Sequence, residues 1–196
     1  MKQKVFGIGL PRTGTGSLSR ALRSLGYKSI HNPDAFRKTQ HEGSFTFDGE
    51  WDALVNFGEH TYPQLDATYP GSKFVLTVRD KEPWLKSLQW LTEYKSLGEM
   101  ANRTLVEIFG FYRFNEQRAS YVYDKHIAEV TEYFRERPDD LLVVDWSDGN
   151  EWDRLCGFLE HPVPEADFPH NNRRGTDVYM KLKRKGRKVL SLWTTR

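Results

Sequence analysis

The segment Gly9-Leu10-Pro11-Arg12-Thr13-Gly14-Thr15-Gly16-Ser17-Leu18 decides the fold of this chain. It follows an apolar run that begins at Val5, and it leads into residues 17–25, whose apolar side chains recur at spacings of three, one and three. That spacing predicts an amphipathic helix, and Gly26 is suited to end it. A loop rich in glycine and hydroxyl groups before a helix offers free backbone amides and the positive end of the helix dipole. The segment therefore predicts a strand, a phosphate-binding loop and a helix, in that order.

The loop matches a Walker A motif only in part. Counting from Gly9, the second glycine is Gly14, but Thr15 stands where that motif has lysine, and Gly16 stands where it has the metal-binding hydroxyl. The cation is instead Arg12, two residues before Gly14. These departures disfavour an ATP-hydrolysing or kinase interpretation. A strand-to-helix turn without any ligand is the other alternative, and it is disfavoured because a cation, glycines and hydroxyls occur together in this context.

Short β-rich runs alternate with helix-like segments along the rest of the chain. The runs are residues 4–10, 27–31, 53–56, 73–79 and 141–145. Two of them are almost wholly apolar, as expected for strands that helices cover on both faces. The alternation predicts an α/β protein, a three-layer αβα P-loop fold with a central parallel sheet flanked by helices. Further helices are expected at residues 83–97 and 119–135, whereas the aromatic-rich residues 98–116 fit either an active-site cover or a cap on the core.

Composition limits the class of protein. The 196 residues contain no internal repeat or linker-like tract, so we expect a single domain, residues 1–196, with a basic C-terminal segment at residues 173–196. No apolar stretch approaches the ~20 residues of a membrane span, and the balance of apolar and charged residues is typical of soluble globular proteins. The lone Cys156 cannot form an internal disulfide, which favours a cytoplasmic location. Residues 173–188 hold eight basic residues and one acidic residue, which fits either an anion site or a solvated basic helix.

The phosphate loop resembles that of the P-loop sulfotransferases. Pro11-Arg12-Thr13-Gly14-Thr15 is similar to the family's 5′-phosphosulfate loop, with arginine for the more usual lysine and Gly16 for its second threonine. The resemblance implies a small single-domain sulfotransferase whose co-substrate is PAPS (3′-phosphoadenylyl sulfate). It also implies that the 5′-phosphate is bound by Arg12, Thr13, Gly14, Thr15, Gly16 and Ser17.

A second stretch is similar to the family's 3′-phosphate motif, in which a strand ends in arginine and a serine follows eight positions later. Here the run 73–79 ends in Arg79, and Ser87 is the eighth residue after it. Taken alone, these two residues fit a structural interpretation better than phosphate binding: a solvated pair of the arginine with the aspartate after it, and a serine on a helix surface. Arginine offers a planar fork of donors and serine one hydroxyl, which together suit a dianionic phosphate. With the first loop beside them, the resemblance implies that Arg79 and Ser87 bind the 3′-phosphate of PAPS.

The C-terminal part extends the resemblance. Residues 152–172 resemble a segment of the small members, Phe-Leu-x-x-Pro-Val-Pro followed by Phe-Pro-His-x-Asn, so that the similarity covers about residues 4–172. Arg173, Arg174 and Gly175 are similar to an Arg-Lys-Gly segment that closes over the 3′-phosphate. Lys185-Gly186 competes for that role.

Sulfuryl transfer to a hydroxyl or an amine requires charge stabilisation on the leaving phosphate and removal of the acceptor's proton. Arg12 is the candidate for the first task because its guanidinium is permanently charged, and no metal is expected. The family often has its general base just after the third strand, where this chain has Asn56, which cannot usefully accept a proton. Glu59 and His60 follow closely and are the candidate catalytic bases. The other candidates for the base are His31, Asp34, Asp48 and Asp52.

The acceptor is expected to be a small molecule or a glycan, without nucleic-acid partners or integral membrane association, and the oligomeric state stays open. Aromatic residues that fit an apolar, phenolic or sugar acceptor, or else the core or an oligomer contact, are Trp51, Tyr62, Trp90, Phe109, Phe111, Tyr112 and Phe114. Two alternative functions remain. One is a P-loop nucleotide phosphotransferase or NTPase, with Asp145 as its magnesium-binding carboxylate. The other is a non-catalytic nucleotide-binding relative that has lost its base at Asn56.

Overall fold

The computed structural model describes residues 3–31, 50–56, 60–94, 99–147 and 149–170. Its centre is a five-stranded sheet with the order β2-β3-β1-β4-β5, in which every pairing is parallel. The strands are β1 (Val5–Gly7), β2 (Ser29–His31), β3 (Ala53–Val55), β4 (Lys73–Thr77) and β5 (Leu141–Val144). All five runs predicted to be strands contain a strand, and each strand is shorter than the predicted run. The predicted α/β fold with a central parallel sheet is confirmed.

Helices connect the strands. They are α1 (Thr15–Ser24), α3 (Tyr62–Thr68), α4 (Lys81–Tyr94), α5 (Glu99–Phe109), α6 (Glu116–Tyr133) and α7 (Glu151–Leu159), with a short 3₁₀ turn at Pro138–Asp140. Helix α5 occupies most of the aromatic-rich stretch that the sequence left unassigned. Helix α6 begins three residues earlier than expected because the side chain of Asn115 caps it by accepting from the backbone N–H of Arg118. None of the helices in the described ranges is long and apolar enough to cross a membrane.

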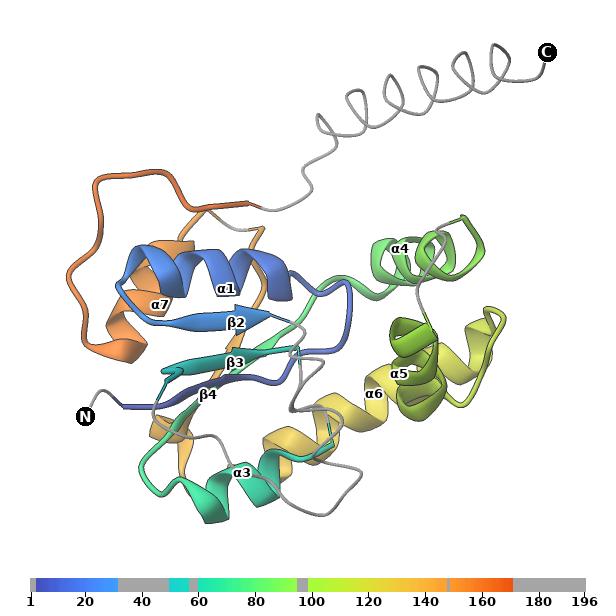
Figure 1. The fold of residues 1–196 in the computed structure, drawn as a ribbon, viewed down its shortest axis with the longest axis horizontal. Coiled ribbons are helices and arrows are strands. Elements are labelled where there is room, and N and C mark those ends of the chain that lie inside the picture. Colours follow the sequence, from blue (N-terminus) through green and yellow to red (C-terminus); the bar gives the residue numbers. More distant parts are fainter. Residues whose placement is uncertain (1–2, 32–49, 57–59, 95–98, 148, 171–196) are drawn as a thin grey trace, which may run out of the picture.

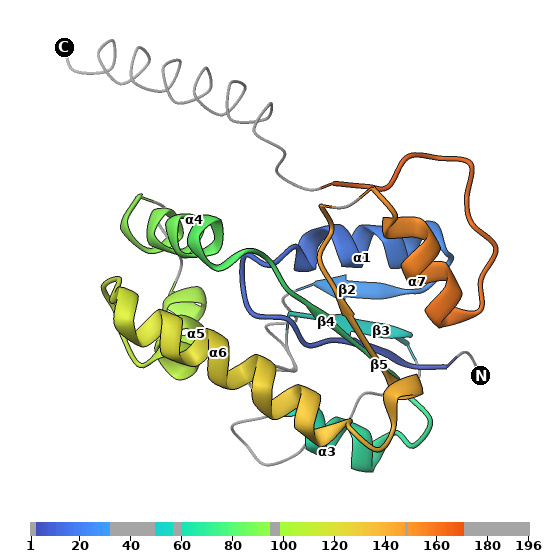
Figure 2. The same ribbon diagram turned by 180° about the vertical axis from the view of Figure 1, so that it is seen from behind.

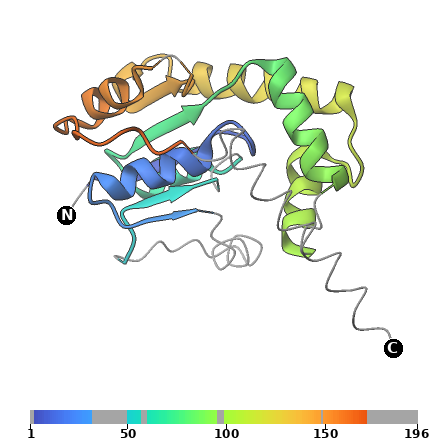
Figure 3. The same cartoon turned by 90° about the horizontal axis from the view of Figure 1, so that it is seen from above.

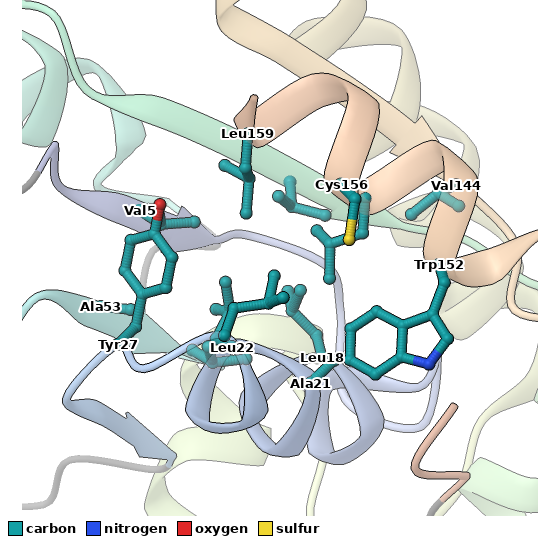
Figure 4. Packing of buried hydrophobic residues seen from close by; sticks show 14 of the residues in the cluster. Val5, Leu18, Ala21, Leu22, Tyr27, Ala53, Val144, Trp152, Cys156 and Leu159 are labelled. Carbon is teal, nitrogen blue, oxygen red and sulfur yellow. The ribbon is translucent and has the colours of Figure 1, made fainter. Parts of the chain in front are cut away.

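The helices cover both faces of the sheet, as a three-layer fold requires. Helices α1 and α7 pack on one face, and α3 and α6 pack on the other (Figures 1 and 2). Successive side chains of a strand point to opposite faces, so Val5 joins the first cluster and Phe6 the second. Cys156 is buried between α7 and the sheet (Figure 4). Covering on both faces explains why the strands read as apolar runs.

Helices α4 and α5 lie beyond the carboxyl ends of the strands, beside the loop that joins β1 to α1 (Figure 3). They form a third apolar cluster with α6, in which Trp84 and Phe109 are fully buried and which includes Leu10 of the loop. The indole N–H of Trp84 donates to the carbonyl of Pro11 at 2.9 Å. This cluster therefore fixes α4 against the phosphate loop, at the edge where parallel α/β sheets bind their ligands.

Candidate functional site

The loop between β1 and α1 is closed tightly over the end of β4. A Cβ at Gly9 would lie 2.0 Å from Oγ1 of Thr77, so only glycine fits there. The hydroxyl of Thr13 donates to the carbonyl of Leu10 at 2.7 Å, and it lies 2.7 Å from the hydroxyl of Thr77, which acts as the donor to it. The loop is therefore held in one shape by buried hydrogen bonds before any ligand arrives.

The amino end of α1 has the features that suit an anion. Gly14 precedes the helix with φ 106°, and a Cβ there would lie 2.5 Å from Cδ1 of Trp146. No side chain caps this end, and the first turn contains no acidic residue. Arg12 also has a positive φ of 76°, which is uncommon for a residue other than glycine. The positive end of the helix dipole is thus left uncompensated beside a cationic loop, which suits a phosphate.

The two predicted phosphate motifs meet directly. Nε of Arg12 donates to the hydroxyl of Ser87 on α4 at 2.9 Å, a contact between residues 75 positions apart in the chain. The same guanidinium lies 5.8 Å from the ring centroid of Trp90, one helical turn further along α4. The predicted 5′-phosphate loop and the serine of the predicted 3′-phosphate motif are therefore in direct contact.

Arg79 is fixed by its backbone, while its side chain is exposed. Its N–H donates to the hydroxyl of Tyr123 at 3.0 Å, and that hydroxyl donates to the carbonyl of Arg79. Burial raises the pKa of the Tyr123 hydroxyl, which keeps it protonated as that donor. No ion pair involving the guanidinium of Arg79 occurs among the described residues, so the Arg-Asp pair that was the alternative interpretation of this strand end does not form there.

The candidates for the general base lie in different surroundings. Nε2 of His31, at the end of β2, lies 3.1 Å from Oγ1 of Thr15 in the phosphate loop. His60 packs edge-on against His126 of α6, with ring centroids 6.3 Å apart, and partial burial lowers the pKa of His60. Its imidazole is therefore neutral at neutral pH, as a base must be.

Other predicted site residues fall elsewhere. Asp52 precedes β3, at the amino ends of the strands, where its carboxylate accepts from the backbone N–H of Lys28 at 2.9 Å, so it is wrong as a candidate base. Asn56 directly follows β3 and is buried, with φ 61°. Several predicted site residues lie outside the described residues: Asp34, Asp48, Glu59, Arg173, Arg174 and Gly175. The basic segment 173–196 also lies outside them. Within the described ranges, no group of three or more metal-binding side chains occurs.

His126 is the residue beside the site that sequence reasoning missed. Its Nε2 donates to the carbonyl of Ile8, at the start of the phosphate loop, at 2.8 Å. The side chain is 4% exposed, and burial lowers its pKa to about 4. A histidine on an apolar helix face is part of no recognisable motif. The only signal for His126 in the sequence was therefore its position in the buried face of the helix that became α6. His126 therefore supports the loop as a neutral hydrogen-bond donor.

We expect the stability of the protein to fall as the pH falls from about 6.5 to about 4 because of His126. The unfolded chain takes up a proton at the ordinary pKa, whereas the folded chain does not until about pH 4, so acid favours unfolding in that window. The loss amounts to about 3 kcal/mol of the free energy of unfolding at pH 4. Urea unfolding at several pH values measures it. The His126→Gln variant keeps a donor for Ile8 but cannot titrate, so an equally steep pH dependence in that variant would contradict the assignment.

Comparison with known proteins agrees with this geometry. Residues 4–176 match the model of a family described as the sulfotransferase domain. The chain is 29% identical over 213 residues to Ava biosynthesis cluster protein M of Aspergillus versicolor, covering 85% of this chain and 80% of that protein. The crystal structure of a sulfotransferase from Alicyclobacillus acidocaldarius is 15% identical and superposes with a TM-score of 0.55 over 93% of this chain and 90% of that one, which shows the same fold. Because that family model spans most of the sequence, the chain belongs to the sulfotransferase domain family.

Proposed function

We propose that this sulfotransferase takes its sulfuryl group from PAPS and transfers it to a hydroxyl or amine acceptor. The observation that carries the proposal is the hydrogen bond between Arg12 and Ser87, because it joins two anion-binding segments into one surface. A donor with phosphates at both its 5′ and 3′ positions needs two such segments side by side. PAPS supplies an activated sulfuryl group, attached through oxygen to its 5′-phosphate.

The residues divide the work of binding and transfer. The backbone and hydroxyls of the loop, Thr13 to Ser17, hold the 5′-phosphate at the amino end of α1. Arg12 stabilises the charge that grows on the leaving oxygen. Arg79 and Ser87 hold the 3′-phosphate, and Arg173-Arg174-Gly175 is proposed to close over it.

Isothermal titration with PAP (3′-phosphoadenosine 5′-phosphate, the product left after transfer) tests this proposal. We expect metal-free binding of PAP that is at least tenfold tighter than the binding of ATP with magnesium. A preference for magnesium-ATP would favour the NTPase alternative. Binding of PAP without turnover on a broad panel of alcohols, phenols, amines and sugars would favour the non-catalytic relative.

The proton of the acceptor is proposed to pass either to His31, which ends β2, or to Glu59 or His60, which follow β3. Loss of a general base costs roughly 10²–10⁴-fold in rate. We therefore expect one of the variants His31→Gln, Glu59→Gln and His60→Gln to lower kcat at least a hundredfold. Titration with PAP serves as the control, and we expect affinity within threefold for Glu59→Gln and His60→Gln. A nearly normal kcat in all three variants would contradict the assignment of the general base to His31, Glu59 or His60.

A further inference from the structure

Trp90 is an exposed aromatic side chain beside the phosphate loop. On the same helix, α4, Trp84 and Leu88 are fully buried in the apolar cluster, whereas Trp90 is 40% exposed and lies outside that cluster. Among the large apolar side chains exposed in the described ranges, Trp90 is the one whose ring lies over Arg12. Packing of the core therefore does not account for a tryptophan at this position.

Helix geometry places Trp90 beside the reacting group. It follows Ser87 by three residues, so both side chains lie on one face of α4. Ser87 accepts from Nε of Arg12 at 2.9 Å, and the centroid of the Trp90 ring lies 5.8 Å from the guanidinium carbon. If Arg12 holds the leaving oxygen, as proposed above, the indole borders the point at which the sulfuryl group is transferred.

We propose that Trp90 forms a wall of the acceptor site and selects acceptors whose hydroxyl is carried by an aromatic ring. This inference rests on the proposed function. An exposed indole offers a flat apolar surface on which another aromatic ring can stack, and that stacking favours phenols over aliphatic alcohols. It also orients the acceptor for in-line attack from the side opposite the leaving oxygen.

The transfer step balances with groups already named. The phenolic oxygen forms a bond to sulfur, and the bond between sulfur and the oxygen of the 5′-phosphate breaks. The electron pair of that bond stays on the oxygen beside Arg12. The phenolic proton passes to the general base, so the products are an aryl sulfate and PAP.

Binding of 2-naphthol to the PAP-saturated protein tests the inference without requiring turnover. We expect the natural protein to bind 2-naphthol at least tenfold more tightly than cyclohexanol, and Trp90→Ala to remove most of that difference. Trp90→Phe keeps an aromatic ring and should bind 2-naphthol within threefold of the natural protein. Tyr112→Ala is the matched control, because Tyr112 is 80% exposed on the connection between α5 and α6, and we expect no change from it.

Affinity for PAP, measured on every variant, separates this inference from the proposed function. Failure of the natural protein to bind PAP would overturn the proposed function itself. Normal PAP binding with no binding of 2-naphthol, or with equal 2-naphthol affinity in the natural protein and Trp90→Ala, would overturn the acceptor inference alone. Weaker binding of PAP in Trp90→Ala with unchanged affinity for 2-naphthol would show that the indole only holds Arg12, and would also overturn it.

Discussion

Replacing Arg12 by alanine should lower kcat by about 10²–10³-fold, the usual cost of removing one donor that stabilises the charge of a transition state. The guanidinium is the cation of the loop, and it is half-buried between Ser87 and Trp90, where solvent screens its charge less than at an open surface. Binding of PAP should weaken far less than kcat falls, because the loop amides and α1 still hold the 5′-phosphate. Transfer from labelled PAPS to the best acceptor of the panel measures kcat. The rate of PAPS hydrolysis without acceptor should fall as well, because the same oxygen leaves in that reaction.

Arg12→Lys is the matched control for this prediction. Lysine restores the positive charge but not the planar fork, so we expect it to recover most of the rate lost by alanine. Equal losses in kcat for lysine and alanine would show that the shape of the guanidinium, rather than its charge, is what matters. A kcat within threefold of normal in Arg12→Ala would contradict the role of Arg12 at the leaving oxygen.

Replacing Arg79 by alanine should weaken the binding of PAP by roughly 10–150-fold, because a hydrogen bond to a charged group contributes about 1.5–3 kcal/mol. The loss should be specific to the 3′-phosphate. AMP lacks that phosphate, so its affinity should change less than threefold. Isothermal titration of both nucleotides measures the difference. The substitution leaves the backbone hydrogen bonds between Arg79 and the Tyr123 hydroxyl in place, so a change in affinity reports on the guanidinium alone.

Arg135→Ala controls for the loss of a surface arginine. Arg135 follows α6 and leads toward the start of β5, so it lies at the edge of the sheet opposite to Arg79, in exposed ion pairs that contribute little to stability. We expect normal affinity for PAP and AMP from that variant. If Arg79→Ala weakened PAP and AMP equally, the assignment of Arg79 to the 3′-phosphate would be wrong.

Much of the fold could be predicted from local sequence. The runs around Phe74 and Val143 are apolar enough, and short enough, to be recognised as strands of a parallel sheet. Helix α3 was missed because its seven residues give too little periodicity, with a proline near its start. Asp52 was misplaced as a site residue because the sequence does not show at which end of a strand a flanking carboxylate lies until the bounds of that strand are known.

The sequence by itself determined the alternation of strands and helices and the family, and it predicted an anion-binding role for the loop around Gly14, because each of these depends on residues close together in the chain. The tertiary structure alone decided that Arg12 meets Ser87, that Trp90 lies over the same guanidinium, and that His126 supports Ile8 across 118 positions. Those contacts depend on the order of the strands in the sheet and on how α4 and α6 pack against it. Local periodicity shows which face of a helix is buried, but not which distant residue that face will meet.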